Sequence, residues 1–434
     1  IYTSAWYNDS NRDDGGYSLE RINPELPCSD QNNWRACIAQ QGGTPGQVNS
    51  VLDTSPDITS PEPISVTLNG AQQIIIQFSE TVDLSSIDEG DIIIEPEASI
   101  VGYGQAQADQ ISVNLDSALD SGIIYTVTVI GIEDCVGNEG QLAQQFNTAV
   151  PQQFQEGDLI INEVLFNPRT GGFDFVEIYN RSDRALSLKN WKMANRESGE
   201  IANILTITRD EILILPAEFK VITEDPQDIG NNYPLGRSVN FIETDDLPSY
   251  GDDEGYVILV DPVIEIHDEF FYNEDYHFSL IDELDGVSLE RIDYERLTND
   301  PTNWHSAAES VGWATPGYEN SQLQPANVTS ESFSIDPEVF SPDNDGFQDV
   351  LNISYALEKP GYVANISIYD RDGRRIRMLV RNELLATKGT ISWDGINDDG
   401  AKARIGVYVL FIEIFDQNGN VSSTKKTAVL GGRL

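Results

Sequence analysis

The chain has 434 residues and is strongly acidic, with 26 basic against 72 acidic side chains and a formal net charge of −46. Nucleic acid and anionic lipid surfaces repel such a charge, so the composition argues against both as partners. No apolar run approaches the roughly 20 residues that a membrane-spanning helix needs, so we expect no direct membrane span. Hydrophobic residues make up 39% of the chain, enough for packed cores, and the length predicts about three domains of roughly 150 residues each.

The first 50 residues contain a motif that returns near residue 300. Ser18-Leu19-Glu20-Arg21-Ile22, Asn33-Trp34 and Thr44-Pro45-Gly46 match residues 288–292, 303–304 and 315–317 in the same order. This is an internal repeat. The first copy holds only the closing half of the segment, and half a β-sandwich leaves open edges and an uncovered apolar face. We therefore expect a longer parent protein, or another polypeptide that completes the first copy. Trp6 and Tyr7 are expected on a strand before the motif.

The three cysteines permit one disulfide. Cys28 and Cys37 lie in a polar, proline-flanked connection, where a loop disulfide is reasonable in an oxidising compartment. We predict that pair, with two free thiols as the open alternative. Cys135 is then the odd one, and it is expected to be a small, inert, buried side chain.

Residues 51–63 are rich in proline, aspartate and serine and predict a linker. From residue 64 to residue 151, apolar and polar residues alternate as in strands, over residues 73–82, 91–94, 111–115 and 125–129. The motifs at residues 78–83 and 134–138 resemble the bacterial Ig-like domain of surface-layer proteins. The resemblance implies a tight turn with Gly137 at positive φ, and a role as a spacer more than as a binding module.

Residues 157–320 form the longest organised segment. An apolar run at residues 159–165 is followed by residues 175–179, whose alternation predicts a strand with one buried face. Together with the closing motif at residues 288–317, this order resembles a lamin tail domain, an Ig-like β-sandwich whose bacterial versions usually sit in large secreted or cell-surface proteins. Glu163, Asp174 and Glu177 recur in the opening strands of that family. We expect their side chains to form hydrogen bonds between strands and loops. The alternative, that two carboxylates act as a pair in glycoside hydrolysis, is left open by the sequence.

Residues 322–332 read as a second, polar linker, and residues 333–434 as a last module. Its motifs, at residues 340–349, 364–374, 393–400 and 406–409, resemble the Ig-like C-terminal domain shared by flagellar hook-capping proteins and gliding-motility-associated proteins of the Bacteroidota. In that phylum such modules end proteins exported by the type IX secretion system. The sequence leaves open whether this module is a sorting signal or a retained structural module.

The sharpest candidate for chemistry is the run Asp343-x-Asp345-Gly346-x-x-Asp349. Alternate carboxylates on a loop that a glycine turns can point oxygens at one centre, as Ca²⁺ requires, and a backbone carbonyl near Phe347 adds another. Ser341 stands where a full calcium loop has its first aspartate, and no bidentate glutamate follows. We predict a structural calcium at these residues, with an Asx-turn network that only shapes the loop as the alternative. The acidic segments 397–400 and 252–254 are expected to be solvated turns.

Support for catalysis is thin. His267, His277 and His305 are the only histidines, and none adjoins a nucleophile motif. A metal cluster of His267 and His277 with their acidic neighbours is disfavoured, because their spacing in strand-like sequence does not put them on one face. No Gly-x-Ser-x-Gly, His-Glu-x-x-His or phosphate-binding loop is present, so we predict that the chain is not an enzyme.

The sequence thus predicts an all-β chain of tandem Ig-like β-sandwich domains. The expected parts are residues 1–50 (closing half of a lamin tail domain), 51–63 (linker), 64–151 (bacterial Ig-like domain), 157–320 (complete lamin tail domain), 322–332 (linker) and 333–434 (C-terminal Ig-like domain). We expect a non-enzymatic, secreted scaffold or interaction protein at the outer-membrane surface, with protein partners in a larger assembly. Two alternatives stay open. One is the accessory region of a secreted hydrolase or nuclease, and the other is an adhesin that binds glycan or protein through aromatics such as Phe270, Phe271, Tyr272, Tyr276 and Phe278.

Overall fold

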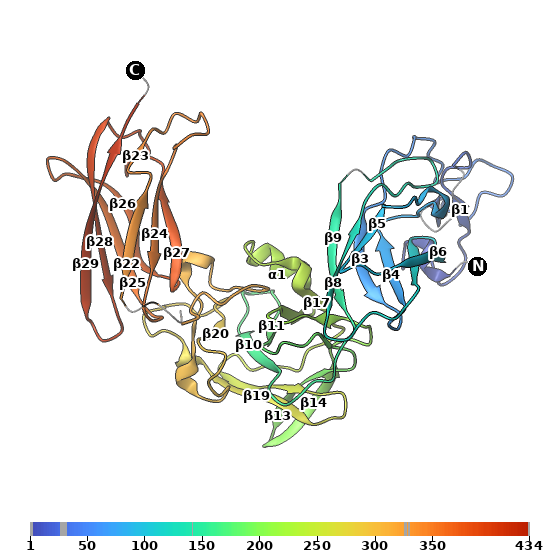
Figure 1. Ribbon diagram of the computed structural model, residues 1–434, viewed down its shortest axis with the longest axis horizontal. Helices are drawn as coiled ribbons and strands as arrows, with labels where there is room; N and C mark the ends of the chain where they lie inside the picture. The colour runs from blue at the N-terminus through green and yellow to red at the C-terminus, as the bar shows by residue number, and fades with distance from the viewer. Residues whose placement is uncertain (1–2, 27–32, 141, 325–327, 329, 433–434) are drawn as a thin grey trace. The chain divides into compact units, whose positions relative to one another are not determined.

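The computed structural model describes residues 3–26, 33–140, 142–324, 328 and 330–432 (Figure 1). Strands dominate the described residues, and most of the strand pairs among them are antiparallel. Two short pairs are parallel, β16 (Phe219–Thr223) with β17 (Phe241–Glu243) and β23 (Val339–Phe340) with β29 (Val421–Leu430). The prediction of an all-β chain of sandwich domains is confirmed. The chain forms two compact units, the first mainly residues up to Gln153 and the second mainly residues from Phe154 on.

The first unit begins with the repeated motif and continues as a small sandwich. Its first part comprises the 3-10 turn η1 (Ser4–Tyr7) and the hairpin β1 (Leu19–Arg21) with β2 (Trp34–Ala36). The sandwich comprises one sheet of β3 (Pro63–Leu68), β4 (Gln73–Phe78), β7 (Gln110–Leu115) and β6 (Ile100–Gln107), and one of β5 (Ile92–Glu95), β8 (Ile124–Val129) and β9 (Gln144–Ala149). Alternate residues of these strands point inward, among them Ile74, Ile76 and Val127 at 0% exposure.

Two expectations for the first unit are wrong in detail. Trp6 and Tyr7 lie in η1 and not on a strand, with the Trp6 ring 6.4 Å from that of Trp34. Pro63, predicted to end the linker, opens β3 and pairs with Phe78. An edge strand accepts proline because its missing N–H can face solvent.

The second unit opens with the sheets of the lamin-tail-like segment. The larger sheet comprises β17 (Phe241–Glu243), β16 (Phe219–Thr223), β11 (Phe175–Asn180), β10 (Leu159–Leu165), β20 (Leu289–Arg291) and β21 (Trp304–Ser306), and the smaller one β14 (Glu200–Thr206), β13 (Lys192–Glu197), β18 (Glu254–Val260) and β19 (Ile266–Asn273). The short helix α1 (Pro226–Asn232) begins at the capping side chain of Asp225. β12 (Leu186–Ser187) pairs with β15 (Leu213–Ile214), and all of this pair except Ile214 belongs to the first unit. The expectation of one buried face for residues 175–179 is wrong. β11 is a central strand and is buried on both faces.

The C-terminal module is a second sandwich within the same unit. Its sheets comprise β22 (Ser332–Asp336), β24 (Leu351–Ala356) and β27 (Lys388–Trp393), and β23 (Val339–Phe340), β29 (Val421–Leu430), β28 (Gly406–Phe415), β25 (Val363–Asp370) and β26 (Arg375–Leu384). Trp393 lies at its centre with 0% exposure, edge-on to Phe340 and Tyr408.

A buried junction joins this module to the lamin-tail-like segment. Gln322, expected to open a polar linker, is fully buried. Its amide nitrogen donates to the carbonyl of Leu385 at 3.2 Å, and its amide oxygen accepts from the backbone of Gly361 at 3.3 Å. The expected linker therefore begins inside an interface.

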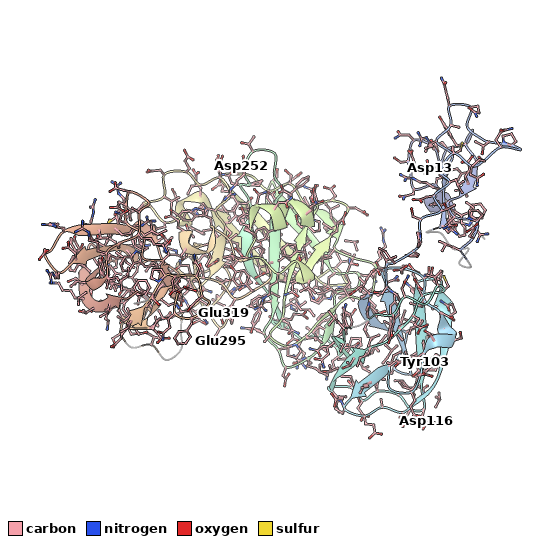
Figure 2. The ribbon with its side chains drawn as sticks, turned by 90° about the horizontal axis from the view of Figure 1, so that it is seen from above. Asp13, Tyr103, Asp116, Asp252, Glu295 and Glu319 are labelled. Carbon is pink, nitrogen blue, oxygen red and sulfur yellow. The ribbon has the colours of Figure 1, made fainter. Side chains whose placement is uncertain are left out.

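Acidic side chains cover the surfaces of both units. Asp116, Asp252, Glu295 and Glu319 are exposed and project from the ribbon in Figure 2. Exposed acidic side chains therefore lie on both units.

Candidate functional site

The acidic loop between β23 and β24 brings together the three carboxylates that the sequence singles out. One ligand oxygen from each of Asp343, Asp345 and Asp349 lies within 4.8 Å of the other two. Asn344, Gly346 and Gln348 have positive φ angles of 61°, 86° and 52°, which fold the chain tightly around the carboxylates. The cluster of hard oxygens matches the ligand chemistry of Ca²⁺.

Hydrogen bonds within this loop also match the alternative, an Asx-turn network. The backbone N–H groups of Asn344 and Gly346 donate to the two carboxylate oxygens of Asp349, at 2.6 and 2.8 Å. The N–H of Phe347 donates to Asp345 at 2.9 Å, while the Phe347 side chain is 69% exposed. The loop is thus organised by its own backbone donors, and calcium at Asp343, Asp345, Phe347 and Asp349 stays a prediction.

Calcium binding would appear as added stability of the C-terminal module. A ligand at 100 times its Kd stabilises the folded state by about 2.7 kcal/mol. We expect millimolar CaCl₂, relative to chelator, to raise the Tm and slow hydrogen exchange of residues 341–349. Asp345→Ala should abolish both effects, whereas Asp399→Ala, at an exposed acidic turn, should leave them intact. Equal stability in calcium and chelator for the unaltered chain would contradict the prediction.

A second group of carboxylates lies in the core of the lamin-tail-like segment. Glu177, Glu163 and Glu290 stand directly opposite one another on β11, β10 and β20, and each is 0% exposed. Like charges at opposite positions of a sheet repel, so such a row needs protonation or dense hydrogen bonding.

Donors from the closing loop surround this row. Ser288 Oγ and the Thr315 backbone N–H donate to Glu163 at 2.5 and 2.8 Å. Thr315 Oγ1 donates to Glu290 at 2.7 Å, and the N–H of Gly317 donates to Glu177 at 2.6 Å. The Ser-x-Glu-Arg and Thr-Pro-Gly parts of the motif are therefore two halves of one hydrogen-bond network.

Burial dominates the electrostatics of the row. It raises the pKa of Glu163 to about 8, with the charge of Glu290 adding to the effect. Burial, followed by the charge of Glu163, raises the pKa of Glu177 well above its usual value, and burial raises that of Glu290. Because no oxygen of the row meets solvent, these carboxyls connect strands to loops and do not form a substrate site. The expected hydrogen-bonding role of Glu163 and Glu177 is confirmed.

The third recurring acid, Asp174, behaves differently. It is only partly buried, and its backbone carbonyl accepts a hydrogen bond from Thr223 at 2.9 Å. Burial, with the charges of Asp252 and Glu224, raises its pKa to about 7.

The histidines pack among aromatic and polar side chains, and His277 and His305 both contact Ser306. The His267 ring packs edge-on against Phe154 and Trp191, with centroids 5.8 and 4.8 Å away. His277 Nδ1 lies 2.9 Å from Ser306 Oγ, and burial lowers the pKa of His277 to about 4. The acidic clusters found in the described part of the chain include no histidine.

Most of the candidate contact aromatics belong to the core. Phe270 and Tyr272 are 0% exposed and Phe278 is 4% exposed, while Phe271 and Tyr276 are half-buried. Phe270 stacks on Trp304 at 3.7 Å. The alternative of an adhesin that binds through these aromatics is therefore disfavoured, because most of the rings that would make the contact are buried in the core.

The cysteines differ from the expectation. Cys37 is a free, buried thiol 3.3 Å from Ser50 Oγ, so the expected Cys28–Cys37 disulfide is wrong at Cys37, and Cys28 lies outside the described residues. The Cys37 side chain is fully buried and contacts both the Ser50 hydroxyl and the Glu20 carboxylate. Cys135, expected to be a free buried residue, is disulfide-bonded and half-buried.

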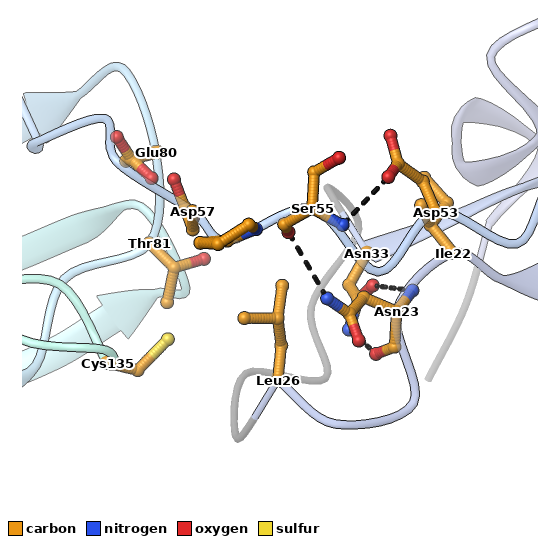
Figure 3. A pocket seen from close by; sticks show the side chains of 11 residues that line it. Ile22, Asn23, Leu26, Asn33, Asp53, Ser55, Asp57, Glu80, Thr81 and Cys135 are labelled. Carbon is orange, nitrogen blue, oxygen red and sulfur yellow. Dashed lines mark hydrogen bonds between the residues drawn. The ribbon is translucent and has the colours of Figure 1, made fainter.

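A pocket of about 260 Å³ in the first unit adjoins Cys135 (Figure 3). Asp57, Glu80 and Asp134 form a second acidic cluster there. Asp134 is buried and accepts from the N–H groups of Val136 and Asn138 at 2.8 and 2.9 Å, and Gly137 has φ 90°. This is the expected tight turn. Sequence reasoning missed the cluster, because its members lie far apart in the chain.

The fold defines a chain of tandem β-sandwich modules. Residues 53–150 match the family model of a bacterial Ig-like domain, residues 152–273 that of the lamin tail domain, and residues 334–429 that of the CHU_C type IX secretion signal domain. The last match identifies a secreted, cell-surface protein. No helix in the described ranges is long and apolar enough to cross a membrane. β20 and β21 complete the large sheet beyond residue 273, so the lamin-tail-like segment extends past its matched range.

Several solved structures have a limited similarity to this chain. They include the N-terminal part of the bacterial S-layer protein SbsC (16% identity, TM-score 0.20, 38% of this chain and 41% of that chain) and a DUF4876 family protein from Bacteroides thetaiotaomicron (14%, 0.25, 50% and 91%). A third is PorZ, a surface component of the type IX secretion system of Porphyromonas gingivalis (11%, 0.20, 92% and 48%). The aligned part spans less than half of that N-terminal part of SbsC and of PorZ, and similarity at these scores transfers no function. No curated protein matches the chain.

Proposed function

We propose that this chain is a non-enzymatic scaffold of the bacterial cell surface, whose modules hold partner proteins at fixed spacing. The support comes from the matched families, none of which is catalytic, and from one structural observation. That observation is the buried junction between the lamin-tail-like segment and the C-terminal module.

Three kinds of contact make the junction stiff. The N–H of Thr387 donates to the carbonyl of Ser321 at 2.8 Å, in addition to the two bonds of Gln322. Lys388 pairs with Glu319 at the rim. An apolar cluster of Phe278, Val363 and Leu384 closes the contact, with Ile281, Trp313 and Phe415 packed against it. A module that serves only as a removable signal needs no such interface, so we infer that this one is retained as a structural part.

The junction can be tested through Gln322. Gln322→Ala leaves the buried Leu385 carbonyl and Gly361 N–H without a partner, and each such group costs about 1–3 kcal/mol. We expect faster hydrogen exchange at residues 358–364 and 384–388 and easier proteolysis after residue 322. The matched control is Gln324→Ala, because Gln324 is exposed. Equal exchange in both variants would argue against a stiff junction.

The function itself is tested on intact cells that produce the protein, with a membrane-impermeant cross-linker. We expect the chain to be recovered from the surface with residues 334–429 still attached and cross-linked to other proteins. Recovery without residues 334–429 would mean that the module is removed at export. Recovery of an uncross-linked protein with hydrolase activity would favour the alternative of an accessory region in a secreted enzyme.

A further inference from the structure

A cavity of about 800 Å³ lies beside the buried junction, within the second unit. The lamin-tail-like segment and the C-terminal module both contribute to its wall. The apolar part of that wall includes Leu280 and Trp313 of the segment and Val363 and Phe415 of the module. Cavities of roughly 300–1,000 Å³ with apolar walls and a few polar groups are typical of small-molecule sites.

Trp313 has a backbone conformation that its side chain disfavours. Its φ angle is 77°, in the left-handed region, where a bulky aromatic residue is an outlier. Its carbonyl accepts hydrogen bonds from the backbone N–H and from the hydroxyl of Ser288, at 3.0 and 3.3 Å. The conformation of Trp313 thus belongs to the hydrogen bonding of the closing motif.

The first copy of the motif shows which residue suits this position. Gly42 lies two residues before the Thr-Pro-Gly part, as Trp313 does in the second copy, and its φ angle is 79°. Its carbonyl accepts from the Ser18 N–H at 2.8 Å, as that of Trp313 accepts from Ser288. Glycine adopts this conformation without strain, whereas a tryptophan in it is destabilising. The fold is therefore satisfied by glycine, and the indole side chain of the second copy needs an explanation of its own.

Packing explains only part of this side chain. Trp313 packs against the apolar cluster of Phe278, Val363 and Leu384. It is nevertheless only half-buried, and it lines the cavity. An indole in a cavity wall provides contact area for an apolar ligand, and its π-face attracts cations more strongly than other aromatic rings do.

The charges around the cavity have one dominant sign. Asp282, Glu283, Asp285 and Glu309 line it, and all four are exposed. Among the described residues of the lining, Arg169 is the one basic side chain. A concave surface with this excess of carboxylates repels anions and attracts cations. The cavity thus combines an apolar wall, a strained tryptophan and negative charge.

We propose that this cavity binds a small organic cation, an amine or guanidinium carried by an aromatic or aliphatic body. The cationic group is attracted by the carboxylates of residues 282–285, and the apolar body contacts Trp313 and Leu280. Because the wall comes from both the lamin-tail-like segment and the C-terminal module, bound ligand stabilises the junction between them. A ligand site of this kind goes beyond the role of a scaffold.

The test uses the whole chain and para-trifluoromethylbenzylamine, which is a cation at neutral pH, with fluorine NMR as the readout. Titrations are made at about 0.15 M salt, which screens exposed charges more than about 8 Å apart. The neutral comparison is para-trifluoromethylbenzyl alcohol. We expect saturable binding of one amine per chain, roughly tenfold tighter than binding of the alcohol. The amine should also slow hydrogen exchange of residues 280–287 and 384–388.

Trp313→Gly tests the side chain without disturbing the backbone that it sits on. Because glycine occupies the equivalent position in the first copy, this variant should fold. It should bind the amine roughly tenfold more weakly, since it loses both the apolar contact and the π-face. Unchanged binding in Trp313→Gly would refute the proposal.

A triple change tests the charges. Asp282→Asn, Glu283→Gln and Asp285→Asn together should weaken binding of the amine roughly tenfold and leave binding of the alcohol unchanged. The matched control changes residues 252–254, also two aspartates and one glutamate, to the corresponding amides. Those residues are exposed and lie outside the cavity lining, so the control should bind the amine as the unaltered chain does.

Three further results would overturn the proposal. The first is the absence of saturable amine binding. The second is equal weakening by the two triple changes, because the amine would then be attracted by the acidic surface as a whole. The third is tighter binding of an acetylated Leu-Lys-Leu amide than of the benzylamine, because the cavity would then suit a basic side chain of a polypeptide and not a small molecule.

Discussion

Raising the pH from about 5 to about 9 should destabilise the lamin-tail-like segment, because its buried carboxyls must then ionise. Folding raises the pKa of Glu163 from 4.5 to about 8. The folded state therefore binds more protons between these values, and its stability is full below about pH 4.5 and is lost as the pH rises through about 8. At about 1.4 kcal/mol per pKa unit, the loss is on the order of 4–5 kcal/mol. Urea unfolding at several pH values, followed by hydrogen exchange in β10 and β20, measures it.

Glu163→Gln is the matched variant for this effect. The amide oxygen can still accept from the Thr315 N–H, and the amide nitrogen can donate to Thr315 Oγ1. We expect it to flatten the loss of stability toward high pH, while Glu218→Gln, at a partly exposed carboxylate, leaves the slope as it is. An unchanged slope in Glu163→Gln would mean that Glu163 is not the group that titrates.

Removing the guanidinium of Arg291 should cost about 3–5 kcal/mol of stability, the range for breaking a buried ion pair. Arg291 is 0% exposed. Its Nε donates to the Ile161 carbonyl at 2.8 Å, its Nη2 lies 3.5 Å from Asp268, and its guanidinium lies 5.4 Å from the Trp304 ring. Arg291→Ala would leave Asp268 partly buried without its cation and a cavity beside Trp304.

The internal repeat provides the control for this prediction. Arg21 is the equivalent residue, but it is only half-buried and no β10 strand covers it. Arg21→Ala should therefore cost much less than Arg291→Ala in denaturant unfolding resolved by hydrogen exchange. Equal losses in the two variants would show that packing under β10 contributes little.

The local pattern of the sequence predicts strands well and their surroundings poorly. Alternation located β4, β5, β7 and β8, because those strands have one face in a core and one toward solvent. The same pattern misled at β11, where a polar residue, Glu177, is buried and satisfied by loops far along the chain. The alternation of apolar and polar residues indicates one buried face of a strand, but it does not show whether the polar face is buried as well.

Candidate sites within one loop could likewise be predicted from the sequence, whereas features that depend on packing between distant segments could not. Asp343, Asp345 and Asp349 lie in one loop, so their spacing alone indicated that they would meet. The bonding state of Cys135 and the burial of Gln322 depend on which modules pack together, and no short-range signal carries that information. The sequence did carry one signal for the contact between Glu290 and Thr315. The Ser-x-Glu-Arg and Thr-Pro-Gly parts of the motif occur together in both copies, which indicates that they interact.

The hydrogen bonds that fix Glu20 have a consequence for any strand that would pair with β1. Thr44 and Ser50 hold this carboxylate in the same way as Thr315 and Ser321 hold Glu290, although no opening strand lies beside it in the described residues. The carboxylate of the closing half is thus fixed by hydrogen bonds within that half. If a strand paired with β1, most of the conformational entropy would be lost by that strand and little by the half that receives it.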